Sequence, residues 1–191
     1  MSAFLVDAGI FLVQVVFGIY ILAVLLRFVL QIVRADFYNP ISQFVVALTN
    51  PPLKPLRRII PGLFGVDLAS IVLLIALQWL ELYLILLIGS SGAGTGLPYS
   101  ALGLLVAAVI ELLRLTIYVF LFAILIRVVL SWVSPYGARG NPAASILNSL
   151  TDPLLRPARR LLPPMQGLDL SPIIVMVGLS LLLLAIKHLV R

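Results

Sequence analysis

Four long apolar runs constrain this chain more than any other feature of its sequence. Crossing the hydrocarbon layer of about 30 Å takes roughly 20 mostly apolar residues. Four segments reach that length, namely 4–33, 68–88, 101–133 and 172–190. Only 10% of the 191 residues are charged, which is too few to coat a water-soluble globule. The sequence therefore predicts an all-α membrane protein with four transmembrane helices; two spans plus buried hairpins is the alternative.

The residue types that are missing exclude several kinds of chemistry. The chain has no cysteine, which excludes disulfides, iron–sulfur clusters and cysteine nucleophiles. Its one histidine, His188, excludes sites built from several histidines. No Ser/His/Asp set, paired carboxylates at catalytic spacing or phosphate-binding glycine loop is recognisable. We expect no enzymatic activity, no catalytic residues, and no metal or other cofactor.

The charges are distributed unevenly along the chain. The net charge is +6, and the basic residues gather between the first and second apolar runs and again between the third and fourth. The Gly/Ser-rich loop at 91–100 carries no charge. Because cytoplasmic loops are rich in Lys and Arg, this pattern predicts cytoplasmic basic segments and an external loop, although Lys187 and Arg191 count against this orientation. We expect a multi-pass membrane protein that does not bind nucleic acid.

The chain contains an internal repeat. Shifting it by 102 residues aligns positions 39–71 with 141–173 and gives 14 identities without a gap. Arg27 matches Arg127 at an offset of 100, which places a two-residue insertion near Tyr136 and Gly137. We divide the chain into repeat 1 (1–90), the loop (91–100) and repeat 2 (101–191). Each repeat contains two spans, so both copies should face the same way, related by a pseudo-twofold axis along the membrane normal.

A basic amphipathic segment lies inside each repeat, at 39–66 and 141–170. Asn39 and Asn141 are suited to cap a helix and are each followed by proline, which favours the first helical position. We expect Pro51 and Pro153 to end that helix and a short basic turn to follow. Such a segment suits the cytoplasmic headgroup layer, where its cations would bind anionic lipid or an acidic partner. The docking candidates are Lys54, Arg57, Arg58, Arg156, Arg159 and Arg160.

Other charged residues fall inside or at the ends of the predicted spans. Arg27 and Arg127 could snorkel to the headgroups, or turn inward and receive Asp67 and Asp169 from the next helix start. Ionisable groups inside a membrane are costly and are candidates for function. Three such residues could either lock the two repeats together or serve transport or gating: Glu81, Glu111 and Arg114.

These motifs together resemble the YggT family. The shared elements are two copies of Asn-Pro, Thr-Asn/Asp-Pro, Pro-x-Arg-Arg and an Asp-Leu pair entering an apolar helix. The resemblance covers both halves and implies a small bacterial inner-membrane protein without an assigned enzymatic activity. Relatives are linked to osmotic or ionic stress tolerance, to cell-division gene clusters and, in plastids, to cytochrome assembly and nucleoid distribution.

The most economical interpretation is a membrane scaffold or assembly factor that organises lipids or proteins at the cytoplasmic face, in osmotic or envelope stress. Its expected partners are anionic lipid headgroups, other membrane proteins or further copies of the chain. The alternative is a small ion or solute transporter or channel involved in osmotic adaptation, which would use the charged residues inside the spans.

Overall fold

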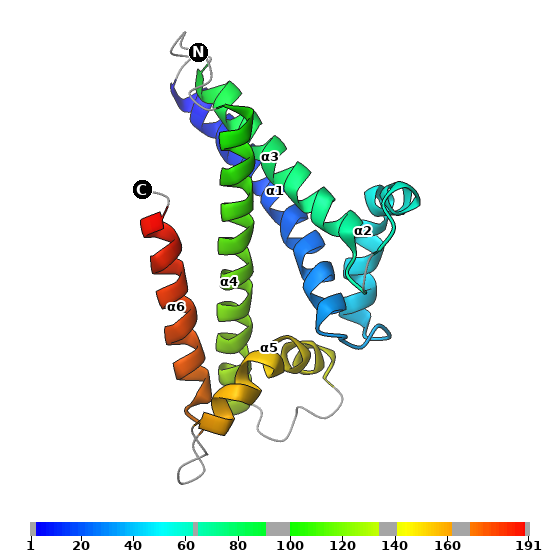
Figure 1. The fold of residues 1–191 in the computed structure, drawn as a ribbon, viewed down its shortest axis with the longest axis vertical. Helices are drawn as coiled ribbons and strands as arrows, with labels where there is room; N and C mark the ends of the chain where they lie inside the picture. The colour runs from blue at the N-terminus through cyan, green and yellow to red at the C-terminus, as the bar shows by residue number, and fades with distance from the viewer. Residues whose placement is uncertain (1–2, 63–64, 91–99, 134–140, 162–168, 190–191) are drawn as a thin grey trace. The chain divides into compact units, whose positions relative to one another are not determined.

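The computed structural model of the chain describes residues 3–62, 65–90, 100–133, 141–161 and 169–189. Four of its helices are long and apolar enough to cross a membrane: α1 (Ala3–Ile32), α3 (Leu68–Ser90), α4 (Ala101–Val133) and α6 (Ser171–Leu189). Between them come α2 (Pro40–Ile59) and α5 (Pro142–Leu161), as Figure 1 shows. By length and composition, the prediction of an all-α protein with four membrane helices is confirmed.

The chain divides into two compact units. The first unit contains Met1–Phe28 and Leu48–Leu113, and the second contains Val29–Ala47 and Arg114–Arg191. Helices α1, α2 and α4 each contribute to both units, whereas α3 belongs to the first and α5 and α6 to the second. The two units are defined by which residues pack together. They differ from the two repeats, which are defined by matching residues in the sequence.

The buried positions of the connecting helix in the first unit correspond, in the repeat alignment, to the buried positions of the connecting helix in the second unit. Thr49 and Leu53 of α2 are completely buried, and so are their counterparts Thr151 and Leu155 of α5. Residues four apart lie on one face of a helix, so each of these helices buries the same stripe. Val24 of α1, in the first unit, and Ile124 of α4, in the second, are likewise completely buried. The repeated sequence thus gives a repeated packing of the connecting helix.

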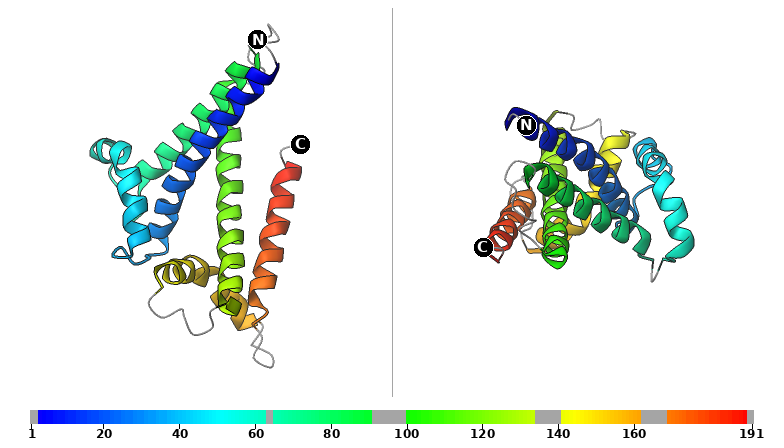
Figure 2. Two further views of the ribbon diagram at one scale, coloured as in Figure 1. Left: turned by 180° about the vertical axis from the view of Figure 1, so that it is seen from behind. Right: turned by 90° about the horizontal axis from the view of Figure 1, so that it is seen from above.

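The membrane helices differ in how much of their surface the protein covers. Helices α1 and α3 run side by side (Figures 1 and 2), and a Cβ atom at Gly9 would lie 3.6 Å from the Cγ2 atom of Ile88. Helix α6 packs on α5, but Ser171 is its only buried residue in the described part of the chain. Its exposed leucines and isoleucines are suited to lipid, because apolar side chains in a membrane need no burial inside the protein.

The expectation that Pro51 and Pro153 end a helix is wrong. Helix α2 continues to Ile59 and α5 to Leu161, with these prolines inside. Proline removes one backbone hydrogen bond and bends a helix without always ending it. The ribbon of α5 changes direction along its length (Figure 1). Leu155, two residues beyond Pro153, is completely buried, and this packing favours continuation of the helix over solvent-exposed coil.

Several sequence-based assignments lie outside the described residues. They are the Gly/Ser loop up to residue 99, the insertion at Tyr136 and Gly137, and the parts of the two basic segments at 63–64 and 162–168. The side of the membrane on which the basic segments lie remains a prediction from charge.

Candidate functional site at the helix junctions

Each connecting helix begins with an asparagine cap. The Oδ1 atom of Asn39 accepts a hydrogen bond of 2.9 Å from the backbone N–H of Ile41, and Asn141 accepts one of the same length from Ala143. These bonds satisfy backbone donors that have no partner inside a helix, and both predicted caps are confirmed. In addition, the Asn39 amide donates to the carbonyl oxygen of Pro142 at 2.8 Å, which joins the starts of α2 and α5 within the second unit.

An arginine near the end of α1 turns inward and binds the middle of α2. The Nη1 atom of Arg27 donates to Thr49 Oγ1 at 2.8 Å and to Asn50 Oδ1 at 2.9 Å. Arg27 is only 7% exposed, so the structure does not show the snorkelling alternative for this residue. These hydrogen bonds to neutral oxygens of the Thr-Asn-Pro motif, together with the nearby charge of Asp67, can offset part of the cost of burying the Arg27 charge.

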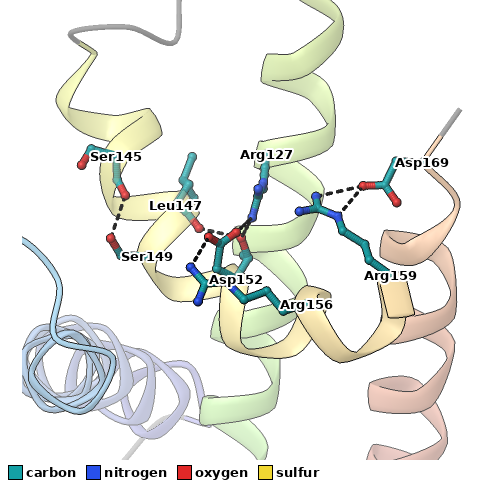
Figure 3. A network of polar contacts seen from close by, with 9 residues as sticks. Arg127, Ser145, Leu147, Ser149, Asp152, Arg156, Arg159 and Asp169 are labelled. Carbon is teal, nitrogen blue, oxygen red and sulfur yellow. Dashed lines mark hydrogen bonds and ion pairs between the residues drawn. The ribbon is translucent and has the colours of Figure 1, made fainter. Parts of the chain in front are cut away.

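Arg127 makes the corresponding contact in the second unit. Its Nη1 atom donates to Thr151 Oγ1 at 2.5 Å and to Asp152 Oδ1 at 2.8 Å, as Figure 3 shows. Here the neutral Asn50 of the first copy is replaced by a carboxylate, and the contact becomes an ion pair. The same carboxylate also pairs with Arg156, which lies one turn further along α5; its Nη2 atom is 3.4 Å from Asp152 Oδ2. The two repeats therefore share the geometry of this contact but differ in its charge.

A second arginine in each copy binds the aspartate that precedes the next membrane helix. Arg57 pairs with Asp67, which also accepts a hydrogen bond of 2.5 Å from the Ser70 hydroxyl. Arg159 pairs with Asp169 at 2.9 Å (Figure 3). One alternative from the sequence placed Asp67 and Asp169 beside Arg27 and Arg127. The ion pairs instead join these carboxylates to Arg57 and Arg159, because the connecting helix carries those arginines to the start of the next span. The charge of Asp67 also acts on Arg27, so for that residue the inward alternative holds in part.

The two pairs differ in exposure. The Asp67 side chain is 5% exposed, whereas that of Asp169 is 38% exposed; both arginine side chains are 39% exposed. Water screens an exposed pair and holds its contribution to stability to about 0–1 kcal/mol. Removing one partner of a buried pair leaves an unsatisfied charge and costs more. The first repeat therefore depends more strongly on its ion pair than the second does.

The three carboxylates at these junctions are held in the ionised form. Burial by itself would raise the pKa of Asp67, but hydrogen bonds from Arg57 and Ser70 and the charge of Arg57 outweigh it, so the pKa lies below its ordinary value. The same balance, with Arg127 and Arg156 against burial, lowers the pKa of Asp152. For Asp169, hydrogen bonds from Ser171 and Arg159 exceed the effect of burial and lower its pKa.

Of the six predicted docking residues, the structure divides those that tie helices together from those that project outward. Arg57 and Arg159 are engaged with aspartates. The Arg156 side chain is 73% exposed despite its contact with Asp152. The residues that present their charges to the surroundings are Lys54, Arg58, Arg156 and Arg160.

Of the three predicted cluster residues Glu81, Glu111 and Arg114, Glu81 is the most enclosed. It is 8% exposed on α3, and its Oε2 atom accepts a hydrogen bond of 2.7 Å from Gln78 one turn earlier. Glu111 and Arg114 lie one turn apart on α4, and each takes part in polar interactions. Whether the three form a functional cluster stays a prediction. No group of three or more His, Cys, Asp or Glu side chains that could hold a metal occurs in the described ranges.

Sequence analysis missed the acceptors in these contacts. Thr49, Thr151 and Asp152 were treated only as part of a helix end, and Gln78 was not considered. The sequence does indicate that these acceptors matter, because the Thr-Asn/Asp-Pro motif occurs in both repeats at the same distance from the Pro-x-Arg-Arg motif. A polar Gln one turn from Glu81 in an apolar helix is likewise a detectable i, i+3 pair.

Comparison with known proteins gives the same family for both halves of the chain. The CCB3/YggT family model matches residues 6–88 and 106–190. An uncharacterized protein of Pseudomonas aeruginosa is 48% identical over 175 residues, which cover 92% of this chain and 86% of the relative. An uncharacterized protein of Vibrio alginolyticus is 39% identical over 170 residues, covering 89% of this chain and 88% of the relative.

The uncharacterized protein YggT of Escherichia coli K12 is 34% identical over 181 residues, which cover 95% of this chain and 90% of the relative. No solved structure matches the chain. The resemblance seen in the motifs is therefore confirmed over nearly the whole length: the chain belongs to the CCB3/YggT family.

Proposed function

We propose that this protein is a non-enzymatic membrane scaffold or assembly factor. Its connecting helices would bind anionic lipid headgroups or an acidic surface of a membrane-protein partner, including a second copy of the chain. The observation that carries this proposal is the outward presentation of Lys54, Arg58, Arg156 and Arg160 on helices that other arginines tie to the spans.

The hydrogen bonds and ion pairs that fix the connecting helices are the physical basis of the proposal. Arg27 and Arg57 connect α2 to residues of α1 and to the start of α3, and Arg127 and Arg159 do the same for α5. A helix held at two points presents its remaining cations with little loss of conformational freedom on binding. Each such cation near an anionic leaflet contributes about 1 kcal/mol.

The setting of this activity is also part of the proposal. The excess of Lys and Arg between the paired spans supports a cytoplasmic position for the two connecting helices. The four apolar helices and the bacterial origin of the relatives support the inner membrane as its location, because proteins that span the bacterial outer membrane are typically β-barrels. The family resemblance supports a role in osmotic or envelope stress, during which lipid and protein organisation at this face would change.

Replacing the four outward cations tests the proposal. A variant with Lys54, Arg58, Arg156 and Arg160 changed to glutamine should lose its preference for anionic over zwitterionic lipid in nanodiscs. Crosslinking from the exposed position of Ile59, which the variant leaves available, should lose its captured partners in native membranes as well. Both losses are expected because the variant lacks four cations, each of which contributes about 1 kcal/mol to the free energy of binding an anionic surface.

A charge-preserving variant provides the control. Changing Arg58, Arg156 and Arg160 to lysine keeps the net charge of the surface and should keep the lipid preference. If the glutamine variant binds anionic lipid and partners as well as the unmodified protein does, the scaffold proposal is wrong.

A transporter or channel for an ion or small solute is the second candidate. The observation that favours it is the Glu81 carboxyl, 8% exposed within a membrane helix and hydrogen-bonded to Gln78. Polar pairs inside a membrane are costly and often mark an ion or proton pathway. Under this proposal Glu81→Gln should alter ion flux in proteoliposomes, while Glu111→Gln reports whether the second carboxyl takes part. A wild-type protein without any flux would remove this candidate.

A further inference from the structure

An open cavity lies on the polar side of α5, entirely within the second unit. Its volume is about 530 Å³, within the usual range for small-molecule sites. Helix α5 connects α4 to α6, two helices that can cross a membrane, so the cavity lies at the chain's transition from one span to the next. The residues that line it are Val33, Ser145, Asn148, Ser149, Asp152, Pro153 and Arg156.

The cavity presents hydrogen-bond donors. The Arg156 side chain is 73% exposed, and its one polar contact in the described part of the chain is a long one of 3.4 Å to Asp152. Within the described ranges, no hydrogen bond involves the Asn148 amide or the Ser145 hydroxyl. The Ser149 hydroxyl donates to the carbonyl oxygen of Ser145 at 3.0 Å, so its oxygen can still accept a hydrogen bond. The lining thus offers a cation, an amide and a hydroxyl together.

The charges around the cavity favour a monoanion. Asp152 binds Arg127 at 2.8 Å and Arg156 at 3.4 Å, so two guanidinium groups face one carboxylate (Figure 3). The local sum is one positive charge. Asp152 can also accept hydrogen bonds from hydroxyl groups of a ligand, since a carboxylate has several acceptor sites.

Two polar residues of the lining, Asn148 and Ser149, have apolar counterparts in the first repeat. The positions that correspond to Ser145, Asn148 and Ser149 at an offset of 102 are Gln43, Val46 and Ala47. Asn50 and Lys54 correspond to Asp152 and Arg156. The basic residue is retained in both copies, but the amide and the two hydroxyls are not. General attraction of a basic helix to a membrane needs only the basic residue, so the additional polar groups require a separate explanation.

We propose that this cavity binds the headgroup of an anionic phospholipid whose phosphodiester carries a hydroxylated alcohol, as in phosphatidylglycerol. The phosphodiester would lie against Arg156, and the headgroup hydroxyls would bind Asn148, Ser149 and Asp152. A guanidinium recognises phosphate through parallel N–H donors, and a hydroxyl can donate to a carboxylate while accepting from an amide. This inference rests on the proposed function, because it assigns one site and one lipid class to the basic surface.

The test replaces the polar pair with its counterparts from repeat 1. The double variant Asn148→Val, Ser149→Ala changes no charge and introduces the pair that α2 already carries as Val46 and Ala47. Phosphatidylglycerol retained by the full chain would be measured by native mass spectrometry after mixing with equal phosphatidylcholine. The variant should retain about tenfold less phosphatidylglycerol, as expected for the loss of one or two hydrogen bonds to the headgroup hydroxyls.

Two single variants act as matched controls for charge. Arg156→Gln should lower retention at least as much as the double variant does, whereas Lys54→Gln, at the equivalent position of repeat 1, should lower retention less, by the share of one outward cation alone. Circular dichroism and thermal unfolding confirm that each variant is folded. A reciprocal variant, Val46→Asn with Ala47→Ser, provides a second check, because additional retention there would support the same headgroup chemistry.

The outcomes separate this inference from the proposed function. If the double variant retains the lipid normally while Lys54→Gln and Arg156→Gln weaken retention equally, the cavity site is wrong and general lipid docking stands. If the unmodified protein shows no preference for phosphatidylglycerol, lipid docking fails together with the cavity. Soluble glycerophosphoglycerol should compete only weakly; competition as strong as that of the intact lipid would identify a free phosphodiester as the ligand and overturn the lipid assignment.

Discussion

Arginine is the residue on which the junctions of this protein depend, and its contribution differs from site to site. Arg27 is buried and shared between two neutral oxygens, Arg127 has a carboxylate, and Arg57 and Arg159 differ in the burial of their partners. The planar guanidinium offers several donors in a fixed geometry, which a lysine at these positions would not reproduce.

Removing the two equivalent helix-junction arginines should have unequal effects on stability. Arg57→Gln leaves the 5%-exposed Asp67 side chain without its cation, and we expect a loss of roughly 1–3 kcal/mol in unfolding free energy. Arg159→Gln leaves an aspartate that water still reaches, so the expected loss is about 0–1 kcal/mol. Thermal or detergent-induced unfolding of the two variants in one lipid mixture measures the difference. Equal losses would show that the burial of Asp67 does not govern the effect.

The pH dependence of stability should follow Asp67. Its pKa in the folded protein lies below the ordinary value of 3.8. A group with a lowered pKa contributes stability at pH values above its unfolded pKa, and this contribution is lost as the pH falls through the folded pKa. The unfolding temperature should therefore hold between pH 7 and about pH 4 and fall below that. Asp67→Asn should reduce the fall in unfolding temperature below pH 4. If the unfolding temperature of this variant depends on pH as that of the unmodified protein does, Asp67 is not the source of the effect.

At the scale of elements, α2 and α5 are equivalent in sequence but are held differently. Both begin at an asparagine cap followed by proline, and both continue through prolines that were expected to end them. The difference is that Asn39 makes a second bond, to the carbonyl oxygen of Pro142, whereas the Asn141 side chain, among the described residues, bonds only within its own helix.

This difference predicts the effect of removing each cap. Asn141→Ala should cost about 1 kcal/mol, the usual value for an N-cap. Asn39→Ala should cost more, by about 0.5–1.5 kcal/mol, because it also removes the bond to Pro142. Unfolding measurements on the two variants and on the double variant provide the comparison. If Asn39→Ala costs no more than Asn141→Ala, the bond between the two helix starts does not contribute to stability.

For the whole molecule, the repeat and the compact units are two different divisions. The repeats come from residue identity at an offset of 102, whereas the first unit takes in part of α4 from repeat 2. Helices of one sequence repeat can therefore belong to different compact units. Membrane helices associate wherever their surfaces fit, so a helix need not pack within its own repeat.

The parity of the spans predicts one orientation for both connecting helices. Two spans separate α2 from α5, so residues 58 and 160 should lie on the same side of the membrane, the cytoplasmic one. The chain has no cysteine, which makes single Arg58→Cys and Arg160→Cys variants direct reporters. A membrane-impermeant thiol reagent should label both in inside-out vesicles and neither in intact spheroplasts. Labelling from opposite sides would contradict the parallel arrangement of the repeats.

The local features of this protein could be predicted from its residues. The four apolar helices follow from hydropathy and length, and the two asparagine caps follow from side chains that bond backbone groups only two residues away. The family followed from motifs that need no knowledge of packing. Each of these depends on neighbouring residues or on residue identity, so the amino-acid order by itself determined them.

Only the tertiary structure decided which cation meets which oxygen. Arg27 reaches Thr49, 22 residues away, and Asp67 forms an ion pair with Arg57 that the sequence did not predict. The continuation of α5 past Pro153 likewise depends on the burial of Leu155. Several acceptors lie within reach of a long arginine side chain along the sequence. The packing of one helix on another brings one of them to hydrogen-bond distance and removes water from it, and no periodicity in the chain encodes that choice.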